Sequence, residues 1–208
     1  MDPKQHILNA AQAVFARHGF RQTAMSMVAD EAGLSRQALY HHFASKEALF
    51  AALVAQLHEA ALGAVREAAR RPAASASAAI AHVMISHHRT LAARLAGSPF
   101  AAELVEESSR QCGALAVQFA RRLDKELEAL CVRLVREVRL QLRPGIGTRD
   151  LVEMVTIAAK GVKATHAGES EAKYARALER MINVICAGVE APRESRGGQE
   201  RIRGRIAK

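Results

Sequence analysis

The chain has 208 residues, enough for one large or two small domains with a hydrophobic core. Half of its residues are hydrophobic, which excludes disorder throughout, while the low aromatic content (4%) and abundant Ala favour an all-α fold over a β fold. The formal net charge of +9 is typical of a protein with an anionic partner such as nucleic acid or a membrane surface, and with no run of about 18 uninterrupted apolar residues we expect no membrane span.

The first expected helix begins at "DPKQ", where Asp2 caps it and Pro3 occupies its first position. Apolar residues follow at helical spacing up to Phe15, and Gly19 ends the helix. A second helix is expected over residues 26–32. Gly33 then gives a tight turn, which predicts a helix-turn-helix.

The third helix, expected over residues 36–43 with Ser35 as its cap, is unusually polar for a short element. Leu39 and Phe43 supply a packing face, and the remaining side chains project elsewhere. Arg can bind guanine, Gln adenine and Ala a thymine methyl in the major groove. The helix is therefore either a solvated surface or a DNA-reading element, and an exposed Tyr40 favours the second interpretation.

The rest of the chain predicts a second all-helical domain. A helix cap is expected at Ser45, Ser75, Thr148 and Ser170. Ser98-Pro99 is expected to cap and begin a further helix. The expected helices cover residues 46–71, 75–95, 111–142, 148–167 and 170–189. With the N-terminal elements this gives about nine helices and three regions: a helix-turn-helix domain (1–48), a larger ligand-binding and dimerisation domain (49–190) and a flexible basic tail (191–208).

The run from Ile7 to Phe50 resembles the DNA-binding domain of the TetR (tetracycline repressor-like) family. His41 and His42 depart from the family pattern, in which an aromatic residue is frequent, and Met27 stands where a β-branched residue is usual. The residues that carry the resemblance are Ile7, Ala10, Ala11, Phe15, Gly19, Phe20, Thr23, Ala29, Ala32, Gly33, Leu34, Ser35, Leu39, Tyr40, His41, His42, Phe43, Lys46, Glu47 and Leu49.

The resemblance implies a homodimeric regulator of transcription in the cytoplasm, without catalytic activity or a cofactor. It would bind a palindromic operator in double-stranded DNA, and a small-molecule effector would alter the spacing of its two DNA-binding domains. The residues expected to contact DNA are Thr23, Ser26, Ser35, Arg36, Gln37, Ala38, Tyr40, His41, His42 and Lys46. His41 and His42 could instead pack against a neighbouring helix.

Two further surfaces are expected in the second domain. The last two helices are the dimer candidates, although the same faces could close the core of one subunit; the residues are Leu151, Val155, Ala158, Val162, Tyr174, Leu178, Met181 and Ile185. The effector site is far less defined, because its candidates are also ordinary core residues; they are Met84, His87, His88, Leu91, Phe119, Arg122 and Met154.

Other functions have weaker support in the sequence. The spacings between His82, His87 and His88 do not suit a metal site on a helix. The three Cys lack the spacing of a metal motif, and their odd number argues against a disulfide framework. No constellation typical of an enzyme is evident. A nucleoid-type protein that binds DNA without specificity, aided by its basic tail, is the main alternative.

Overall fold

The computed structural model describes residues 2–166 and 169–191, so the expected basic tail falls outside the described residues apart from Ala191. Across the described part the fold is all-α, as predicted. Its nine helices are α1 (Pro3–Gln22), α2 (Met25–Glu31), α3 (Arg36–His42), α4 (Lys46–Arg70), α5 (Ala76–Ala93), α6 (Ala101–Gln111), α7 (Gly113–Arg136), α8 (Thr148–Thr165) and α9 (Glu171–Val189).

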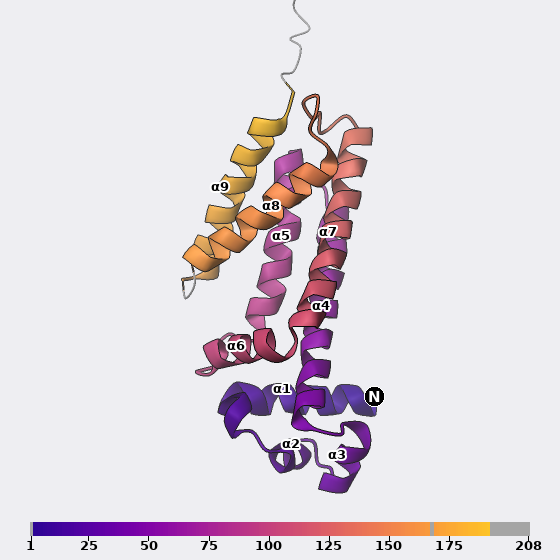
Figure 1. The fold of residues 1–208 in the computed structure, drawn as a ribbon, viewed down its shortest axis with the longest axis vertical. Coiled ribbons are helices and arrows are strands. Elements are labelled where there is room, and N and C mark those ends of the chain that lie inside the picture. The colour runs from indigo at the N-terminus through magenta and orange to yellow at the C-terminus, as the bar shows by residue number, and fades with distance from the viewer. Residues whose placement is uncertain (1, 167–168, 192–208) are drawn as a thin grey trace, which may run out of the picture.

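The helices form two lobes joined by α4 (Figure 1). The lower lobe, here called the head, contains α1, α2 and α3, with α6 lying above α1. The upper lobe contains α5, α7, α8 and α9 around the upper part of α4, and α8 crosses in front of α5. One end of α4 thus belongs to the head and the other to the upper lobe.

Two hydrophobic clusters correspond to the two lobes. The head cluster includes α4 residues up to Val54, beyond the predicted boundary at residue 48, together with Leu104 and Cys112 beside α6. The upper cluster takes α4 residues from Leu62 onward. Since a single helix contributes to both cores, a change in the packing of the upper lobe can move the head through α4.

Four helix starts have the predicted caps. The side chains of Asp2, Ser35, Ser45 and Ser75 each accept a hydrogen bond from a backbone N–H in the first turn, at 3.0–3.1 Å. Other starts differ from the expectation. Ser170 stands at the N-cap of α9 without a side-chain cap hydrogen bond, and α6 begins at Ala101 with Phe100, not Ser98, at its N-cap. The α2 helix begins at Met25, so that Ser26 lies inside it, and the carboxylate of Asp150 accepts from Gly147 at the start of α8.

The predicted length of α7 is wrong. The helix ends at Arg136 and does not reach Leu142, because Val138 adopts a φ of 57° and turns the chain. The following segment then pairs with the end of α9: Arg143 N–H donates to the Val189 carbonyl at 2.9 Å, and Ala191 N–H donates to the Gln141 carbonyl at 2.8 Å.

Within the described residues, α4 is long and apolar enough to cross a membrane. In this structure it packs against α1, α5 and α7 instead, as the central helix of both lobes. Its apolar residues are interrupted by Gln56, His58, Glu59 and Arg66, so α4 contains no uninterrupted apolar run of about 18 residues. The three Cys are buried and unpaired, as an ordinary core role predicts.

Candidate nucleic-acid interface and effector site

The turn between α2 and α3 fixes the position of the α3 helix. Gly33 has a φ of 62°, and the Leu34 N–H donates to the Ala29 carbonyl at 2.9 Å. The α3 helix is anchored by Leu39, which is fully buried, and by Phe43, which follows its last residue. Because α3 has only two turns, these two anchors hold all of its other side chains in defined directions.

The outward face of α3 carries hydrogen-bonding groups and no carboxylate. The Arg36 guanidinium lies 5.6 Å from the centre of the Tyr40 ring, and 40% of Tyr40 is exposed. Residues 34–46 contain no Asp or Glu. The exposed members of the predicted DNA-contact set are Ser26, Ser35, Arg36, Gln37, Tyr40, His41 and His42, while Ala38 is half-buried.

Thr23 has an internal role in place of the predicted phosphate contact. Only 3% of Thr23 is exposed, and its hydroxyl donates to the Gly19 carbonyl at 2.6 Å. The hydroxyl therefore stabilises the kink at the end of α1 and does not face the DNA side. The burial of the Thr23 side chain therefore contradicts the predicted contact with a phosphate.

Lys46 is likewise directed toward the end of α1. Its ammonium donates to the carbonyls of Phe20 at 2.8 Å and Thr23 at 2.9 Å, and it lies 4.4 Å from the centre of the Phe20 ring. These contacts occupy the N–H donors of the Lys46 ammonium within the head. Lys46 thus joins α1 to the start of α4, a structural role that the sequence pattern does not indicate.

The expected dimer residues are mostly in the core of this one chain. Leu151, Val155, Val162, Tyr174 and Leu178 are all buried among α5, α7, α8 and α9. They cannot form an interface with a second copy, so for these five the alternative that they close one subunit's own core is correct. Of the remaining three, Met181 is exposed and Ala158 and Ile185 are half-buried.

A different apolar surface lies on the same two helices. Met154 and Ile157 on α8 and Met181 and Val184 on α9 are exposed, Ile157 by 60% and Val184 by 69%. Met154 was expected in the effector site, and its exposure corrects that assignment. These four residues are called the outer apolar face.

Histidines and aromatic rings from several helices meet in the upper lobe. The His58 ring of α4 stacks on Phe119 of α7 at 4.8 Å between centroids, and the His88 ring of α5 stacks on Tyr174 of α9 at 3.7 Å. Burial lowers the pKa of His87 to about 4, with further lowering by His58, Lys163 and His88. Burial also lowers the pKa of His58 and His88, so all three imidazoles are mainly neutral at pH 7.

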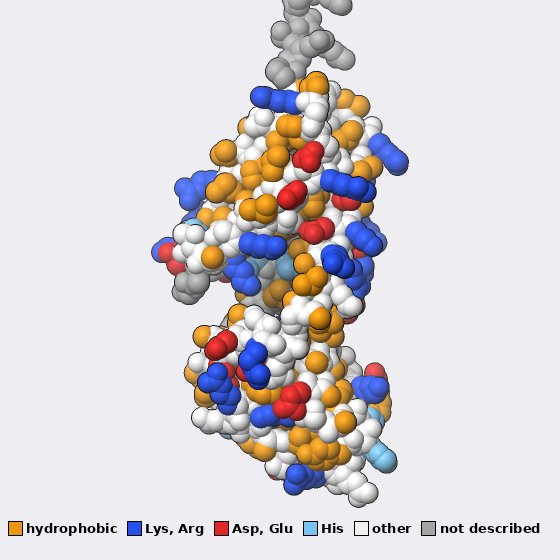
Figure 2. Space-filling model, viewed as in Figure 1, with side chains coloured by type: hydrophobic (Ala, Val, Ile, Leu, Met, Phe, Trp, Pro, Cys, Tyr) orange, Lys and Arg blue, Asp and Glu red, His pale blue; other side chains and the backbone are white. Residues whose placement is uncertain are grey.

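The second half of α5, which carries His87 and His88, is less buried than its first half. All the buried residues of α5 lie between Ala76 and Met84, and from Ile85 onward the helix is half-buried or exposed. Figure 2 shows a notch between the two lobes, below α8 and above α6, with His atoms inside it and Lys or Arg atoms around its edge. We call His58, His87, His88, Phe119, Lys163 and Tyr174 the histidine cluster.

The expected effector residues divide between this cluster and other places. His87, His88, Leu91 and Phe119 lie in or beside it, and Met84 is a core residue. Arg122 lies beside the cluster, with its guanidinium 5.0 Å from the centre of the Phe119 ring, and it also pairs with Glu59. His58 was missed, although it lies four residues from both Val54 and Leu62 on the apolar stripe of α4, which was the available signal.

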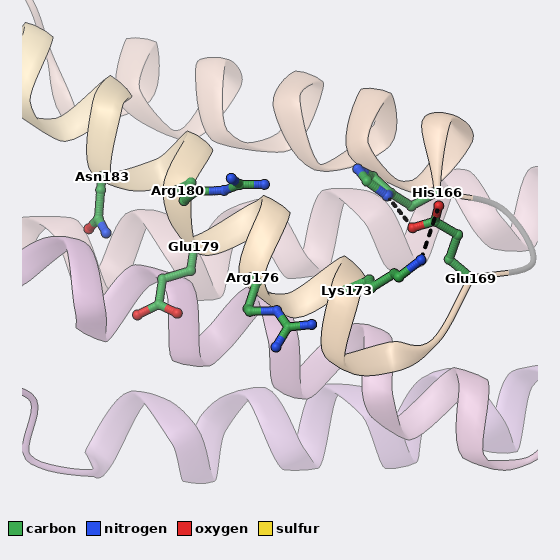
Figure 3. Close-up of a pocket in the computed structure, with 7 residues that line it drawn as sticks. All are labelled: His166, Glu169, Lys173, Arg176, Glu179, Arg180 and Asn183. Atoms are coloured by element: carbon green, nitrogen blue, oxygen red, sulfur yellow. Dashed lines mark hydrogen bonds and ion pairs between the residues drawn. The ribbon is translucent and has the colours of Figure 1, made fainter.

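Two grooves on the surface are separate from the histidine cluster. One of about 440 Å³ runs along an exposed side of α9, where Glu169 accepts from His166 and pairs with Lys173 (Figure 3). The other, of about 420 Å³, lies between residues 74–77, Val138 and the end of α9. Within the described residues no group of three or more His, Cys, Asp or Glu is arranged to hold a metal ion.

Comparisons with known proteins agree with the helix-turn-helix geometry of the head. Residues 7–53 match the model of the bacterial regulatory proteins of the tetR family. The HTH-type transcriptional regulator UidR of Escherichia coli strain K12 is 42% identical over 64 residues, 31% of this chain and 33% of UidR. The HTH-type transcriptional repressor AcnR of Corynebacterium efficiens is 40% identical over 53 residues, 26% of this chain and 28% of AcnR. The chain thus matches a third or less of these curated relatives' length.

Solved structures share the fold over almost the whole chain. A TetR transcription regulator from Haloarcula marismortui has a TM-score of 0.69 at 14% identity, covering 91% of this chain and 99% of that one. SmeT, the repressor of the Stenotrophomonas maltophilia multidrug efflux pump SmeDEF, has a TM-score of 0.66 at 23% identity, covering 91% of both chains. At these identities the likeness concerns the fold alone.

Proposed function

We propose that the chain, whose residues 7–53 match the model of the bacterial regulatory proteins of the tetR family, is a DNA-binding transcriptional repressor, active in the cytoplasm, that an effector releases from its operator. The observation that carries the proposal is the geometry of α3. The helix buries Leu39 and directs Arg36, Gln37 and Tyr40 outward on a face without carboxylates. Such a helix can enter the major groove, with its N-terminal residues at the base edges.

The proposed contacts differ in kind. Arg36 and Gln37, in the first turn of α3, are assigned to base edges, since Arg can bind guanine and Gln adenine with two hydrogen bonds. Ser26, Ser35, Tyr40, His41 and His42 are assigned mainly to phosphates, which fix register without reading sequence. Lys46 and Thr23 contribute by holding the head together.

We assign the dimer interface to the outer apolar face. Its members are too large and too exposed for an ordinary solvated surface, and they lie on adjacent helices. Gly161 and Gly188, exposed on the same two helices, allow helices of a second copy to approach closely. A two-fold dimer of this kind presents two heads to half-sites about one DNA turn, ~34–36 Å, apart.

The effector is assigned to the histidine cluster and the notch beside it. This region touches the upper part of α4 through His58, and α4 continues into the core of the head. An effector that binds better to one arrangement of these helices shifts the pair of heads toward that arrangement, by its difference in affinity for the two states.

The experiment that tests the proposal is to sequence the genomic DNA fragments retained by the purified protein. A DNA-reading dimer retains fragments that share a palindrome with half-sites about one turn apart. Fragments with no common sequence would reject it in favour of non-specific, nucleoid-type binding.

A further inference from the structure

The histidine cluster has more hydrogen-bonding capacity than its own side chains use. Within the described residues, His58 Nδ1 is the buried side-chain nitrogen or oxygen atom without a hydrogen-bond partner. A buried polar group without a partner is destabilising, so such an atom in a native protein calls for an explanation. A ligand group that binds His58 supplies one.

The sign of the charge around the cluster favours an anion. Burial is the main cause that lowers the pKa of His58, His87 and His88, and Lys163 of α8 lowers all three further, so its positive charge acts on all three rings. Lys163 is exposed, and the described residues give it no ion pair.

Most carboxylates on the helices around the cluster form ion pairs with arginines. Glu171 raises the pKa of His88 slightly against these effects, but it is itself paired with Arg89. Asp124 on α7 faces Lys160 rather than the histidines. The other pairs on α4 and α7 are Glu59 with Arg122 and Glu126 with Arg66.

The body of the ligand must be apolar. Phe119 and Tyr174 are themselves buried against the His58 and His88 rings, while Leu91 and Leu115 lie half-buried on the neighbouring helices. A small inorganic anion would leave the exposed parts of these two leucines in contact with water, whereas an acyl chain or an aromatic ring would cover them.

We infer that the effector is an amphipathic carboxylate, whose anionic group lies between His58, His87 and Lys163 and whose apolar body packs against Leu91 and Leu115. The inference rests on the proposed function only in calling the ligand an effector, because binding at the site can be tested without DNA. The carboxylate accepts hydrogen bonds from the imidazole N–H groups and the ammonium, and Lys163 supplies the opposite charge.

The test is isothermal titration calorimetry of the full chain with three probes and their uncharged counterparts. The probes are octanoate, decanoate and 1-naphthoate, each compared with its primary amide, which has the same shape without the charge. We expect at least one carboxylate to bind on the order of tenfold more tightly than its amide. If no carboxylate binds, or if the amides bind equally well, the inference is rejected.

Two matched variants locate the site. Lys163→Met removes the charge and keeps a long side chain, and it should abolish the preference for the carboxylate; Lys160→Met, on the same helix, should leave it unchanged. His58→Phe, which keeps the stacking on Phe119, should also lower the affinity for the carboxylate. A preference that survives both Lys163→Met and His58→Phe would overturn the inference.

A separate measurement distinguishes this inference from the proposed function. The unliganded protein is titrated with the retained genomic DNA in a mobility-shift assay. Failure there rejects the proposed function while the calorimetry still decides whether the carboxylate site exists. If specific DNA binding is found and the calorimetry fails, only the ligand class is wrong.

Discussion

The carboxylate of Glu103 on α6 accepts a hydrogen bond of 2.8 Å from the backbone N–H of Arg21 at the end of α1. The contact joins segments 82 residues apart and holds α6 against the kink at Gly19. Nearby, the Ser98 hydroxyl donates to the Ala16 carbonyl at 2.7 Å. The end of α1 is therefore fixed to the segment around α6 by side chains, in addition to the apolar contacts of the head cluster.

Gly19→Ala should destabilise the protein. Gly19 has a φ of 71° and ψ of 174°, which L residues rarely adopt, and an added Cβ would lie 2.7 Å from a Glu103 oxygen and 2.9 Å from the Phe100 ring. We expect a loss of roughly 1–3 kcal/mol in the free energy of unfolding, measured with urea. Gly63→Ala, in an open helical position, is the control and should be neutral or stabilising. Equal stability of the two variants would contradict this reading of the kink.

Lys46→Met should reduce the stability of the head. The variant keeps the apolar stem beside Phe20 but removes the donors to the Phe20 and Thr23 carbonyls. A loss of about 1–2 kcal/mol is expected in thermal or urea unfolding. Lys4→Met, which removes an exposed charge from the same lobe, serves as the control. If only DNA affinity falls and stability is unchanged, Lys46 acts as the phosphate contact that the sequence pattern predicts.

Gln37→Ala should weaken operator binding without destabilising the fold, because Gln37 is exposed on α3. A bidentate contact to a base contributes about 1–3 kcal/mol of discrimination. The loss should therefore be confined to one base-pair position when operator variants are compared in a binding assay. A uniform loss across all sequences would instead assign Gln37 to the phosphate backbone.

Stability should fall as the pH is lowered from about 6.5 to 4. The pKa of His87 is about 4 in the folded chain because burial disfavours the charged ring, whereas the unfolded chain binds a proton near pH 6.5. The stabilising effect of the neutral ring is thus complete above pH 6.5 and is lost as the pH falls toward 4. Urea unfolding at pH 7.5 and 5 measures the change. His87→Gln should reduce the pH dependence, and the exposed-site control His82→Gln should not.

Ile157→Glu combined with Val184→Glu should produce a monomer. A charge buried at a dimer interface without a partner is strongly destabilising, whereas at an exposed position it costs little. Light scattering at micromolar concentration should report a dimer for the wild type. Val117→Glu, at a comparably exposed position on α7, should remain dimeric. A wild-type monomer, or a double variant that still dimerises, would reject the outer apolar face as the interface.

The head could be predicted in detail because the sequence features that specify its helices and turns act over only a few residues. Caps such as Ser35 and Ser45 act within one turn, and Gly33 specifies its turn through its own backbone. The upper lobe depends on contacts between distant segments. The end of α7 illustrates this: Leu134 and Val138 continue the helical spacing, yet the hydrogen bond between Arg143 and Val189 belongs to another element and has no local signature.

The two proposed surfaces of the upper lobe, the outer apolar face and the histidine cluster, are harder to predict for a related reason. Both sides of α8 and α9 carry apolar residues, so spacing alone does not tell which side faces the chain's own core. Leu151 and Ile157 are chemically similar, but one is fully buried and the other is mostly exposed. His58 was missed because a single histidine in an apolar stripe does not by itself indicate a site; its neighbours Phe119 and Lys163 come from other helices.

The measurement that tests the central claim most directly compares two dissociation constants at one salt concentration. One DNA carries the palindrome recovered from the genomic fragments, and the other carries the same bases in scrambled order. The account predicts that the palindrome is bound on the order of 10³-fold more tightly at physiological salt, and that Gln37→Ala removes part of this ratio. Nearly equal affinities for the two DNAs would contradict it.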